Sequence, residues 1–481
     1  MPMNPTLADK LYADERVEEA RRLLHAAVGD YQRELVGVRA ADPTRAEAYD
    51  EMIEHFAQLR GGGLYYPYLG SGLGRGALVE LADGSVKYDM IGGIGAHVCG
   101  HSHTAMIEAT VDAALRDTVM QGHLQQNTES AALCRRLVEL AGEGGAELQH
   151  CFLTTSGAMA NENAMKIAFQ KAHPADRLLA FEHCFAGRTL ALAQLTDKPA
   201  YREGLPKTID VDYLPFFEGD DAAGSTRRAV AVLEQHLRRY PNRHAAMWFE
   251  LVLGEGGYYP GCRDFFAALM DVLKEHDVAI VVDEVQTFGR TTRPFAFAHF
   301  ELDSYVDIVT IGKMTQVCAT LFGQALRPRP GLISQTFTGS TSSLFAAKAI
   351  IDALTSGGYF GHRGRIAQVH ERFASRLEAI GARQNGQVRG PYGLGGMIAM
   401  TVGDGSIDQA KQFLRLLYDA GVIAFVAGSA PARVRFLPPL IAITDEDIDT
   451  VTDITEQALI ALARQNDQVH VHQAPASRSN D

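Results

Sequence analysis

The sequence predicts an α/β protein with a large, mostly parallel sheet wrapped by helices and a smaller α/β domain. From about residue 145, apolar strand-like segments alternate with helical or loop segments, and this alternation is typical of parallel sheets. The 481 residues exceed the length at which one hydrophobic core usually stops growing. After about residue 345, long helical patterns and short strands replace the alternation. We therefore expect two domains, the smaller one built from both chain ends.

The amino-terminal segment, residues 5 to about 58, is charged and carries an apolar residue every three or four positions. This period predicts amphipathic helices that pack on the body of the protein. The strands expected in the large sheet are the apolar segments 148–155, 177–183, 245–252, 278–285, 306–312 and 321–326.

The carboxy-terminal part is expected to contain long helices at 344–354 and 365–381 and strands at 395–403 and 432–441. A last helix is predicted to begin at Thr444, with Asp447 completing a capping box, and to end near Gln465. The expected domains are 1–90 for the amino-terminal helices and part of the small domain, 91–345 for the large domain, 346–465 for the rest of the small domain, and 466–481 for a disordered tail.

Composition and charge exclude several classes of protein. Hydrophobic residues make up 46% and charged residues 21%, which is ordinary for a folded chain. The formal net charge of −13 disfavours binding to nucleic acid or to anionic membranes. No apolar run approaches the length of a membrane span, and the first residues carry no apolar signal segment. The six cysteines are scattered without a CxxC pair, so we expect free thiols and a cytoplasmic protein.

Two charged residues end consecutive buried strands: Asp283 closes VAIVVD and Lys313 follows VDIVTIG. In an α/β sheet, ligands bind beyond the carboxyl ends of the strands, so we expect both side chains in one cavity. This arrangement suits pyridoxal phosphate, because the amine carries the cofactor and the acid keeps the pyridine nitrogen protonated. Taken alone, the pair is also compatible with a strand-end Asp and a solvated Lys. The neighbouring motifs favour the cofactor.

A phosphate site is predicted where the strand at 148–155 turns into a helix, in the segment TTSGAMANENAMK. The free N–H groups and the dipole of a helix N-terminus attract anions, so Ser156, Gly157 and Ala158 are candidate phosphate ligands. A plain capped helix is the alternative, since Ser and Gly are common caps. The acid and amine pair favours the phosphate interpretation.

Further side chains are candidate contacts in the same cavity. Phe185 follows a strand and can cover one face of the pyridine ring, and Arg188 can bind a substrate carboxylate with two hydrogen bonds. A core Phe and a surface Arg are the alternatives. Arg435 lies between apolar residues in RVRFLPPL, which predicts an anionic partner, and Glu255 in the turn GEGG is the candidate.

Two other patterns are not interpreted as ligand sites. The glycines of residues 70–76, GSGLGRG, follow no buried strand and open no helix, unlike a dinucleotide fingerprint. His97, Cys99, His101 and His103 alternate along the chain, but ligands on one extended strand cannot surround a tetrahedral metal ion without a sharp bend. We therefore expect no metal, and we assign these residues to turn and helix-entry contacts.

From about residue 70 to 445 the chain resembles the class III, or ω-amino-acid, aminotransferases, which have the type I pyridoxal phosphate transferase fold. The motifs that carry the resemblance include TTSGAMANENAMK, HCFAGRT, FELVLGEGG, VVDEVQTFGRT, TIGKMTQVCA, TFTGSTSS and VRFLPPL. The resemblance implies that Lys313 carries the cofactor, Asp283 meets the ring nitrogen, Gln286 approaches the ring hydroxyl and Phe185 stacks on the ring. It also implies that Thr338 binds the phosphate of the other subunit in a homodimer.

The motifs SGAMANENAMK and GKMTQVCA are similar to those of lysine 6-aminotransferases, and Arg188 in GRT is similar to the carboxylate-binding arginine of enzymes acting on ornithine, acetylornithine and lysine. The resemblance thus implies transfer of a terminal amine to 2-oxoglutarate, with Glu255 leaving Arg435 when the oxo acid binds. The positions that depart from the family pattern are Met159, Ala186, Ser342 and Ser343.

Other functions stay open at this point. The chain is also compatible with a 4-aminobutyrate-type ω-transaminase, with an aminomutase, racemase or decarboxylase on the same fold, and with a binding protein that has kept the fold without turnover. The reactions of pyridoxal phosphate diverge with the substrate bond that stands perpendicular to the ring, and the sequence does not define that angle. The amino donor is likewise open.

Overall fold

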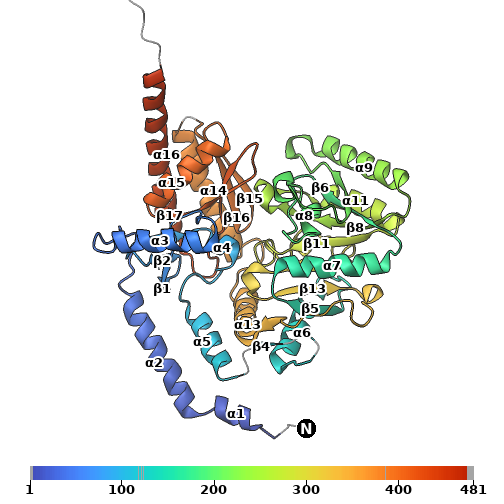
Figure 1. The fold of residues 1–481 in the computed structure, drawn as a ribbon, viewed down its shortest axis with the longest axis horizontal. Coiled ribbons are helices and arrows are strands. Elements are labelled where there is room, and N and C mark those ends of the chain that lie inside the picture. Colours follow the sequence, from blue (N-terminus) through green and yellow to red (C-terminus); the bar gives the residue numbers. More distant parts are fainter. Residues whose placement is uncertain (1–3, 117–118, 121, 123, 385, 474–481) are drawn as a thin grey trace, which may run out of the picture.

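The structure, a computed structural model, describes residues 4–116, 119–120, 122, 124–384 and 386–473. Figure 1 shows the elements from the middle of the chain gathered on one side and those from both chain ends on the other. The chain ends therefore share one domain, as the sequence predicts.

The large sheet has the strand order β5-β13-β12-β11-β8-β6-β7. The strands span β5 His150–Thr154, β6 Arg177–Phe181, β7 Asp210–Leu214, β8 His244–Phe249, β11 Ala279–Glu284, β12 Ile308–Ile311 and β13 Cys318–Phe322. Neighbouring strands from β12 to β7 are parallel, and β13 is antiparallel to β12 and β5. Every residue of β8 and β12 is buried, which explains why all but one residue of each strand is apolar. The predicted mostly parallel sheet is confirmed.

The strand predicted at 321–326 is largely wrong. β13 begins three residues earlier, at Cys318, and ends at Phe322, where Gly323 leads into a 3₁₀ helix at Gln324–Leu326. The small residues Ala319 and Thr320 are fully buried in this strand because they pair with β12 and β5 inside the sheet. Tertiary pairing therefore outweighs the weak apolar signal of this segment.

The helices of the middle of the chain span α5 Thr104–Ala114, α6 Thr128–Gly142, α7 Gly157–Lys171, α8 Leu192–Leu195, α9 Ala222–Arg239, α10 Gly254–Gly257, α11 Arg263–Glu275, α12 Ala296–His299 and α13 Thr341–Ser356, with 3₁₀ turns at Pro199–Tyr201, Gly219–Asp221 and Lys313–Thr315. Of these helices, α6, α7, α8, α9 and α11 pack against strands of the large sheet. Short strands also pair, β4 Val119–Met120 with β14 Gly339–Ser340 and β9 Val252–Leu253 with β10 Tyr259–Pro260. On α7, Ala160, Ala164 and Ala168 recur every four residues and are fully buried, so the helix lies close to β8, β12 and β13.

The small domain joins the two chain ends through strand pairing. Its strands are β1 Gly70–Arg75, β2 Leu78–Leu81, β3 Val86–Asp89 and β17 Val422–Ile423 in one sheet, and β15 Val388–Leu394, β16 Met397–Val402, β18 Phe425–Ala427 and β19 Arg433–Phe436 in another. The parallel pair of β3 and β17 sets Tyr88 opposite Val422, more than 300 residues later in the chain. The segment GSGLGRG forms β1, a paired strand rather than a phosphate loop.

The predicted amino-terminal helices are present as α1 Leu7–Tyr12, α2 Glu15–Gln32 and α3 Ala46–Arg60, followed by the short α4 Gly92–Gly95. An ion pair between Arg21 and Asp112, at 2.6 Å, holds α2 on α5. The guanidinium of Arg116 lies 3.9 Å from the centre of the Tyr12 ring and so holds α1 in place.

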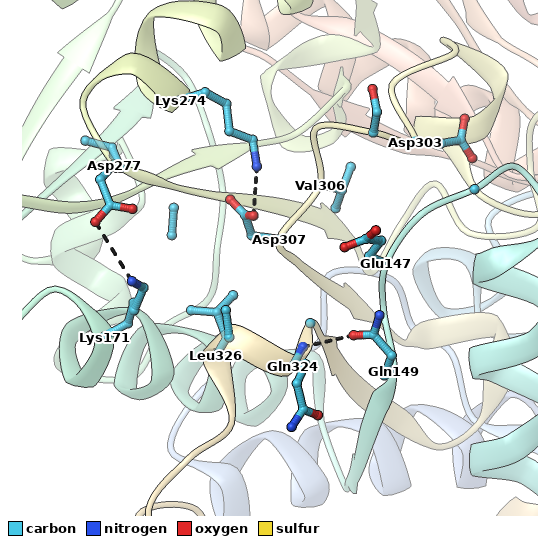
Figure 2. A pocket seen from close by; sticks show the side chains of 16 residues that line it. Glu147, Gln149, Lys171, Lys274, Asp277, Asp303, Val306, Asp307, Gln324 and Leu326 are labelled. Atoms are coloured by element: carbon cyan, nitrogen blue, oxygen red, sulfur yellow. Dashed lines mark hydrogen bonds and ion pairs between the residues drawn. The ribbon is translucent and has the colours of Figure 1, made fainter.

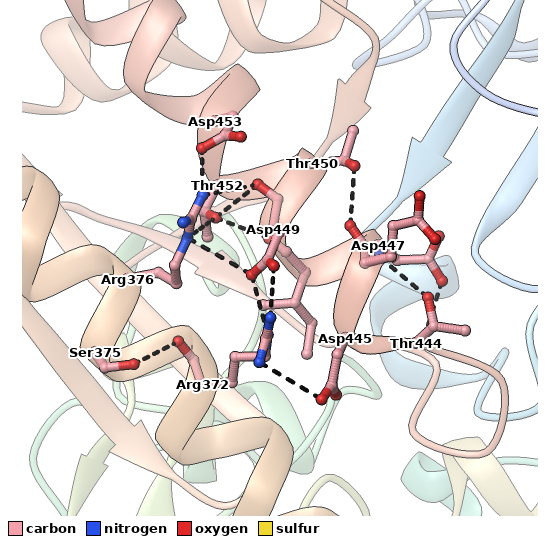
Figure 3. A network of polar contacts seen from close by, with 12 residues as sticks. Arg372, Ser375, Arg376, Thr444, Asp445, Asp447, Asp449, Thr450, Thr452 and Asp453 are labelled. Atoms are coloured by element: carbon pink, nitrogen blue, oxygen red, sulfur yellow. Dashed lines mark hydrogen bonds and ion pairs between the residues drawn. The ribbon is translucent and has the colours of Figure 1, made fainter.

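Two long helices of the small domain, α14 Arg365–Arg383 and α16 Asp445–Gln473, are joined by a row of ion pairs. Figure 3 shows Arg372 and Arg376 of α14 directed toward Asp445, Asp449 and Asp453 of α16. Arginines four residues apart share one helix face, and so do the aspartates, which brings the two rows together. The row fixes the last helix to the body of the small domain.

The start of α16 was predicted correctly and its end was not. The backbone N–H of Asp447 donates to Thr444 Oγ1 at 3.1 Å, and that of Thr444 donates to Asp447 Oδ2 at 2.9 Å, which is the predicted capping box. The helix passes the predicted end at Gln465 and reaches Gln473, because no Gly or Pro interrupts residues 466–473. The remainder of the predicted tail, 474–481, lies outside the described residues.

Within the described part of the chain, no helix combines the length and the apolar character needed to cross a bilayer.

Candidate active site

Asp283 and Lys313 face one cavity at the carboxyl edge of the large sheet. Asp283 is in β11, paired in register with Thr310 of β12, and Lys313 follows β12 after Gly312. Lys313 has a positive φ of 54°, a backbone conformation uncommon outside glycine, which turns the chain sharply as it leaves the strand. The cavity encloses about 350 Å³ and is also lined by Gly157, Ala158, Asn161, Phe185, Ala186, Gly187, Arg188, Glu250, Val252, Glu255, Val285, Gln286 and Thr287.

The carboxylate of Asp283 is buried but held by two donors. The Val285 backbone N–H donates to Oδ1 at 2.9 Å and the Asn161 amide donates to Oδ2 at 2.7 Å. Burial raises the pKa of Asp283, and these hydrogen bonds and the nearby Lys313 partly oppose the increase. A buried carboxylate in this state is stabilised by any cation that enters the cavity beside it.

The pKa of the Lys313 amine is lowered toward neutral pH. Burial lowers the pKa of Lys313 from 10.5 to about 8, although the carboxylates of Glu255 and Asp283 favour the charged form. At pH 7 roughly one amine in ten is therefore neutral, far more than for a solvated lysine. A neutral amine is the form that attacks an aldehyde and accepts a proton.

The predicted phosphate segment forms the N-terminus of α7. Ser156 is the N-cap, and its Oγ accepts a hydrogen bond from the Met159 N–H at 3.1 Å. Gly157 and Ala158 line the cavity, whereas Ser156 does not. A Cβ at position 157 would lie 2.7 Å from Val285 Cγ1, so the close approach of α7 to β11 requires glycine. The first N–H groups of the helix are thus presented to the cavity, as an anion site requires.

Gln286 and Phe185 lie on the same cavity. Gln286 is buried, and its Oε1 has no hydrogen-bond partner among the described residues. A Cβ at position 254 would lie 2.5 Å from this oxygen, so a glycine at this position is needed to make space for the Gln286 side chain. Phe185 is partly exposed, and its backbone N–H donates to Glu250 Oε2 at 2.7 Å. One unpaired acceptor and one aromatic face therefore remain available to a ligand.

The predicted pair of Glu255 and Arg435 is present. Glu255 Oε1 in α10 lies 2.7 Å from Arg435 Nη2 in β19, and the Arg435 side chain is fully buried. Glu255 and the Tyr258 hydroxyl both lie near the guanidinium and favour its charged form, but none of the Arg435 nitrogens has a well-aligned acceptor among the described residues. The contact is therefore an ion pair that leaves Arg435 donors free for another anion.

Arg188 reaches the cavity from its exposed side. Its guanidinium lies 4.0 Å from the centre of the Tyr201 ring, and Arg188 is largely exposed to solvent. Arg188 therefore differs from a plain surface arginine in two respects: its side chain packs on a ring, and it lines the cavity.

Thr338 is not part of this cavity. It is only 2% exposed, and its hydroxyl has no partner among the described residues. Thr336 and Phe337, which precede it, are exposed. The next residues belong to the N-terminal cap of α13, where Ser340 and Ser343 form a reciprocal capping box. The departure from the family pattern at Ser343 therefore has a structural role.

The sequence analysis did not identify two residues that line the cavity, Asn161 and Glu250, as part of the site. Asn161 donates to Asp283, and Glu250 accepts from the backbone N–H groups of Phe185 and Gly254. Burial raises the pKa of Glu250 to about 8, with Asp283 adding to the increase. The spacing of Asn161 from Gly157, one helical turn, is the signal that places both on one face of α7.

A second cavity, of about 660 Å³, lies at the opposite edge of the sheet, near the start of β11 and before β12. Figure 2 shows its lysines directed toward acids: Lys274 is 2.9 Å from Asp307, and Lys171 is 3.9 Å from Asp277. Both amines are partly exposed and already paired, and this edge is not the one that binds ligands in α/β sheets. The amine with a lowered pKa, that of Lys313, is in the first cavity.

The alternating histidines have local roles. His103 is the N-cap of α5, and its Nδ1 accepts from the Ala105 N–H at 3.2 Å, which is the predicted helix-entry contact. His101 lies 3.0 Å from the buried Asp89. In the part of the chain that the structure describes, no group of three or more His, Cys, Asp or Glu residues is arranged to hold a metal ion.

Comparison with known proteins identifies the family to which this chain belongs. The pattern of the family described as aminotransferase class-III matches residues 71–459. The LysW-aminoadipate semialdehyde transaminase of Deinococcus radiodurans is 30% identical over 394 residues, which cover 80% of this chain and 85% of that protein. The acetylornithine aminotransferase of Mycobacterium tuberculosis is 31% identical over 379 residues, which cover 76% of this chain and 86% of that protein.

Solved structures give the same fold. The lysine aminotransferase from M. tuberculosis has a TM-score of 0.76 at 24% identity, covering 85% of this chain and 99% of that one. The ornithine aminotransferase from Toxoplasma gondii has a TM-score of 0.74 at 22% identity, covering 88% and 100%. The predicted type I fold is confirmed by these neighbours, and the family match shows that this chain belongs to the class III aminotransferases.

Proposed function

We propose that this aminotransferase depends on pyridoxal phosphate and moves the terminal amino group of a basic amino acid, such as lysine, ornithine or acetylornithine, to 2-oxoglutarate. The observation that carries the proposal is the cavity lined by Lys313, Asp283 and Glu255, together with the ion pair that joins Glu255 to Arg435. The donor class is supported by the names of the relatives, which include acetylornithine, lysine and aminoadipate semialdehyde transaminases.

The residues of the cavity fit this cofactor. Asp283 is a buried carboxylate suited to a protonated ring nitrogen, and Gln286 Oε1 is an unpaired acceptor suited to the ring hydroxyl. The N–H groups of Gly157 and Ala158 would hold the phosphate, and the Phe185 ring would cover one face. When bound, pyridoxal phosphate supplies an electron sink for negative charge that develops on the substrate carbon.

Lys313 has two tasks in this account: its Nζ holds the cofactor at rest and moves the proton during reaction. Burial lowers the pKa of Lys313 to about 8, so the freed amine accepts a proton from the substrate carbon near neutral pH. Lys313 is only partly exposed, which limits the exchange of this proton with bulk water.

Glu255 and Arg435 allow one pocket to serve two substrates. When the donor presents a terminal amine, Glu255 neutralises Arg435, so the donor does not have to supply a carboxylate beside Arg435. When the oxo acid binds, Glu255 turns toward solvent, where its side chain is already 25% exposed, and Arg435 takes the α-carboxylate. Arg188, at the exposed wall of the cavity, holds the distal carboxylate.

A homodimer completes the site in this proposal. The apolar side chains of Leu124 and Phe337 are 86% and 58% exposed, beside the short strands β4 and β14, and a second copy would cover them. Thr336, which is exposed, is better suited than the buried Thr338 to reach the phosphate of the other subunit. Replacing Thr336 by Val is expected to speed the loss of pyridoxal phosphate on dialysis, with Thr338→Val as the matched control. If only the Thr338 variant loses cofactor, Thr338 is the phosphate ligand.

The proposal is tested with a panel of donors: lysine, ornithine, acetylornithine, 4-aminobutyrate and β-alanine, each with 2-oxoglutarate. We expect one of the basic amino acids to give the highest kcat/KM, with one glutamate formed for each donor consumed. Highest activity with 4-aminobutyrate would instead identify a 4-aminobutyrate-type transaminase. Donor loss without glutamate formation would identify an aminomutase or decarboxylase.

A further inference from the structure

Tyr258 is a buried tyrosine in a backbone conformation that tyrosine rarely adopts. It follows α10 with φ +59° and ψ +56°, in the left-handed region, and its side chain is fully buried. The backbone N–H of Tyr258 donates to Leu253 O at 2.8 Å, which closes the turn. Glycine would adopt this conformation at lower cost, so the tyrosine side chain itself is the feature to explain.

The buried hydroxyl of Tyr258 interacts with the Arg435 guanidinium but forms no well-aligned hydrogen bond among the described residues. The tyrosine lies near two buried arginines, and the Arg435 guanidinium is 5.8 Å from the centre of its ring. Burial raises the pKa of Tyr258 to about 12, and Arg435 and Arg290 partly oppose the increase, so the hydroxyl stays neutral at physiological pH. A neutral phenol oxygen can accept a hydrogen bond from a guanidinium.

Arg435 needs such an acceptor at one stage of the proposed reaction. Its ionic partner is Glu255, and its nitrogens have no aligned acceptor in the described part of the chain. Once Glu255 turns away, a fully buried guanidinium would be left without an ionic partner until the carboxylate of the oxo acid arrives. An uncompensated buried charge is strongly destabilising.

We propose that Tyr258 is a positioning residue for Arg435, whose buried hydroxyl accepts a guanidinium N–H when Glu255 leaves and so keeps Arg435 in place for the α-carboxylate of the acceptor. This inference rests on the proposed function, because it concerns the acceptor half of that reaction. Tyr258 does not line the cavity, so it acts through Arg435 and not on the substrate. The donor half, in which Glu255 stays on Arg435, does not depend on it.

The test compares Tyr258→Phe with Tyr259→Phe. Both variants lose one hydroxyl from adjacent tyrosines that pack near arginines, since the Tyr259 ring lies 3.7 Å from the Arg433 guanidinium. The first readout is binding of glutarate, an unreactive dicarboxylate, to the holoenzyme by titration calorimetry. The second is the rate of each half-reaction, followed by the absorbance of the cofactor. The enzyme loaded with pyridoxal phosphate is mixed with donor alone, and the enzyme loaded with pyridoxamine phosphate is mixed with 2-oxoglutarate alone.

We expect Tyr258→Phe to weaken glutarate binding and to raise the concentration of 2-oxoglutarate needed for half-maximal rate by about tenfold, with the donor half-reaction unchanged. Tyr259→Phe should resemble the wild type. In an Arg435→Lys background, Tyr258→Phe should add no further loss, because the tyrosine acts through that arginine. An equal effect on both half-reactions, no effect on glutarate binding, or a full effect in the Arg435→Lys background would overturn the inference. If none of the amino donors changes the cofactor absorbance of the wild-type holoenzyme, the proposed function fails instead.

Discussion

Replacing Asn161 by Ala tests how the protein holds the carboxylate at the centre of the cavity. The Asn161 amide donates to Asp283 Oδ2 at 2.7 Å, and its oxygen accepts from Thr310 Oγ1 at 2.8 Å and from Trp248 Nε1 at 3.3 Å. The bond to the ionised carboxylate contributes about 1.5–3 kcal/mol, and each buried donor left unpaired costs about 1–3 kcal/mol. Loss of the amide also raises the pKa of Asp283 further, because one of the groups that oppose the effect of burial is gone.

We expect Asn161→Ala to lower the free energy of unfolding by about 3 kcal/mol and to weaken pyridoxal phosphate binding by about tenfold to a hundredfold. Urea denaturation measures the first, and titration of the apoprotein followed by cofactor absorbance measures the second. Asn163→Ala is the matched control: Asn163 is buried on the same helix, and its Nδ2 has no hydrogen-bond partner among the described residues. Cofactor affinities that are equal in the two variants would refute the role given to Asn161.

Three further experiments test the Glu255 switch, the Lys313 amine and the attachment of the last helix, α16. Glu255→Ala frees Arg435 in both half-reactions, so activity with glutamate as donor should rise relative to a terminal-amine donor in a steady-state assay; an unchanged donor preference would remove the switch. Burial lowers the pKa of Lys313 to about 8, and the amine is protonated below that pH, so the rate at which apoprotein captures pyridoxal phosphate should rise with pH and level off above about 8. A rate that still climbs at pH 10 would mean a solvated amine. Arg376→Gln breaks the ion pair with Asp453, which is partly exposed, so the free energy of unfolding should fall by about 0.5–1 kcal/mol at low salt and by less in 1 M NaCl. A loss that persists in high salt would assign the effect to packing.

The charged residues of the site could be predicted because each follows or interrupts an apolar strand. Asp283 and Lys313 end buried strands, and parallel neighbours bring such ends together. Arg435 lies in a strand that is buried throughout, so a charged partner was required, and Glu255 provides it.

Other parts of the site depend on tertiary contacts that leave no periodic signal. Asn161 lies in a helix interior, where an Asn is usually an ordinary solvent-facing residue, and only the packing of α7 on the sheet directs its amide to Asp283. Tyr258 follows a glycine-rich turn, and the sequence does not indicate that its ring is buried. The segment around Thr338 has no strand or helix period, so which of its hydroxyls is exposed follows from the structure alone.

The fold was predicted more completely than the element ends. The alternation of strands and helices predicted the large sheet, and the change of pattern after residue 345 predicted a small domain built from both chain ends. However, β13 begins three residues before the predicted strand, and α16 extends eight residues past its predicted end. Element ends depend on single stop signals, and here Gly323 ends a strand early while no Gly or Pro ends the helix.

The central claim, that the Nζ of Lys313 carries pyridoxal phosphate, is tested most directly by borohydride reduction of the holoprotein followed by peptide mapping. Reduction fixes the cofactor to the amine that holds it, and the account predicts one pyridoxyl label, on the peptide that contains Lys313. A label on another lysine, or no label on protein saturated with the cofactor, would contradict it.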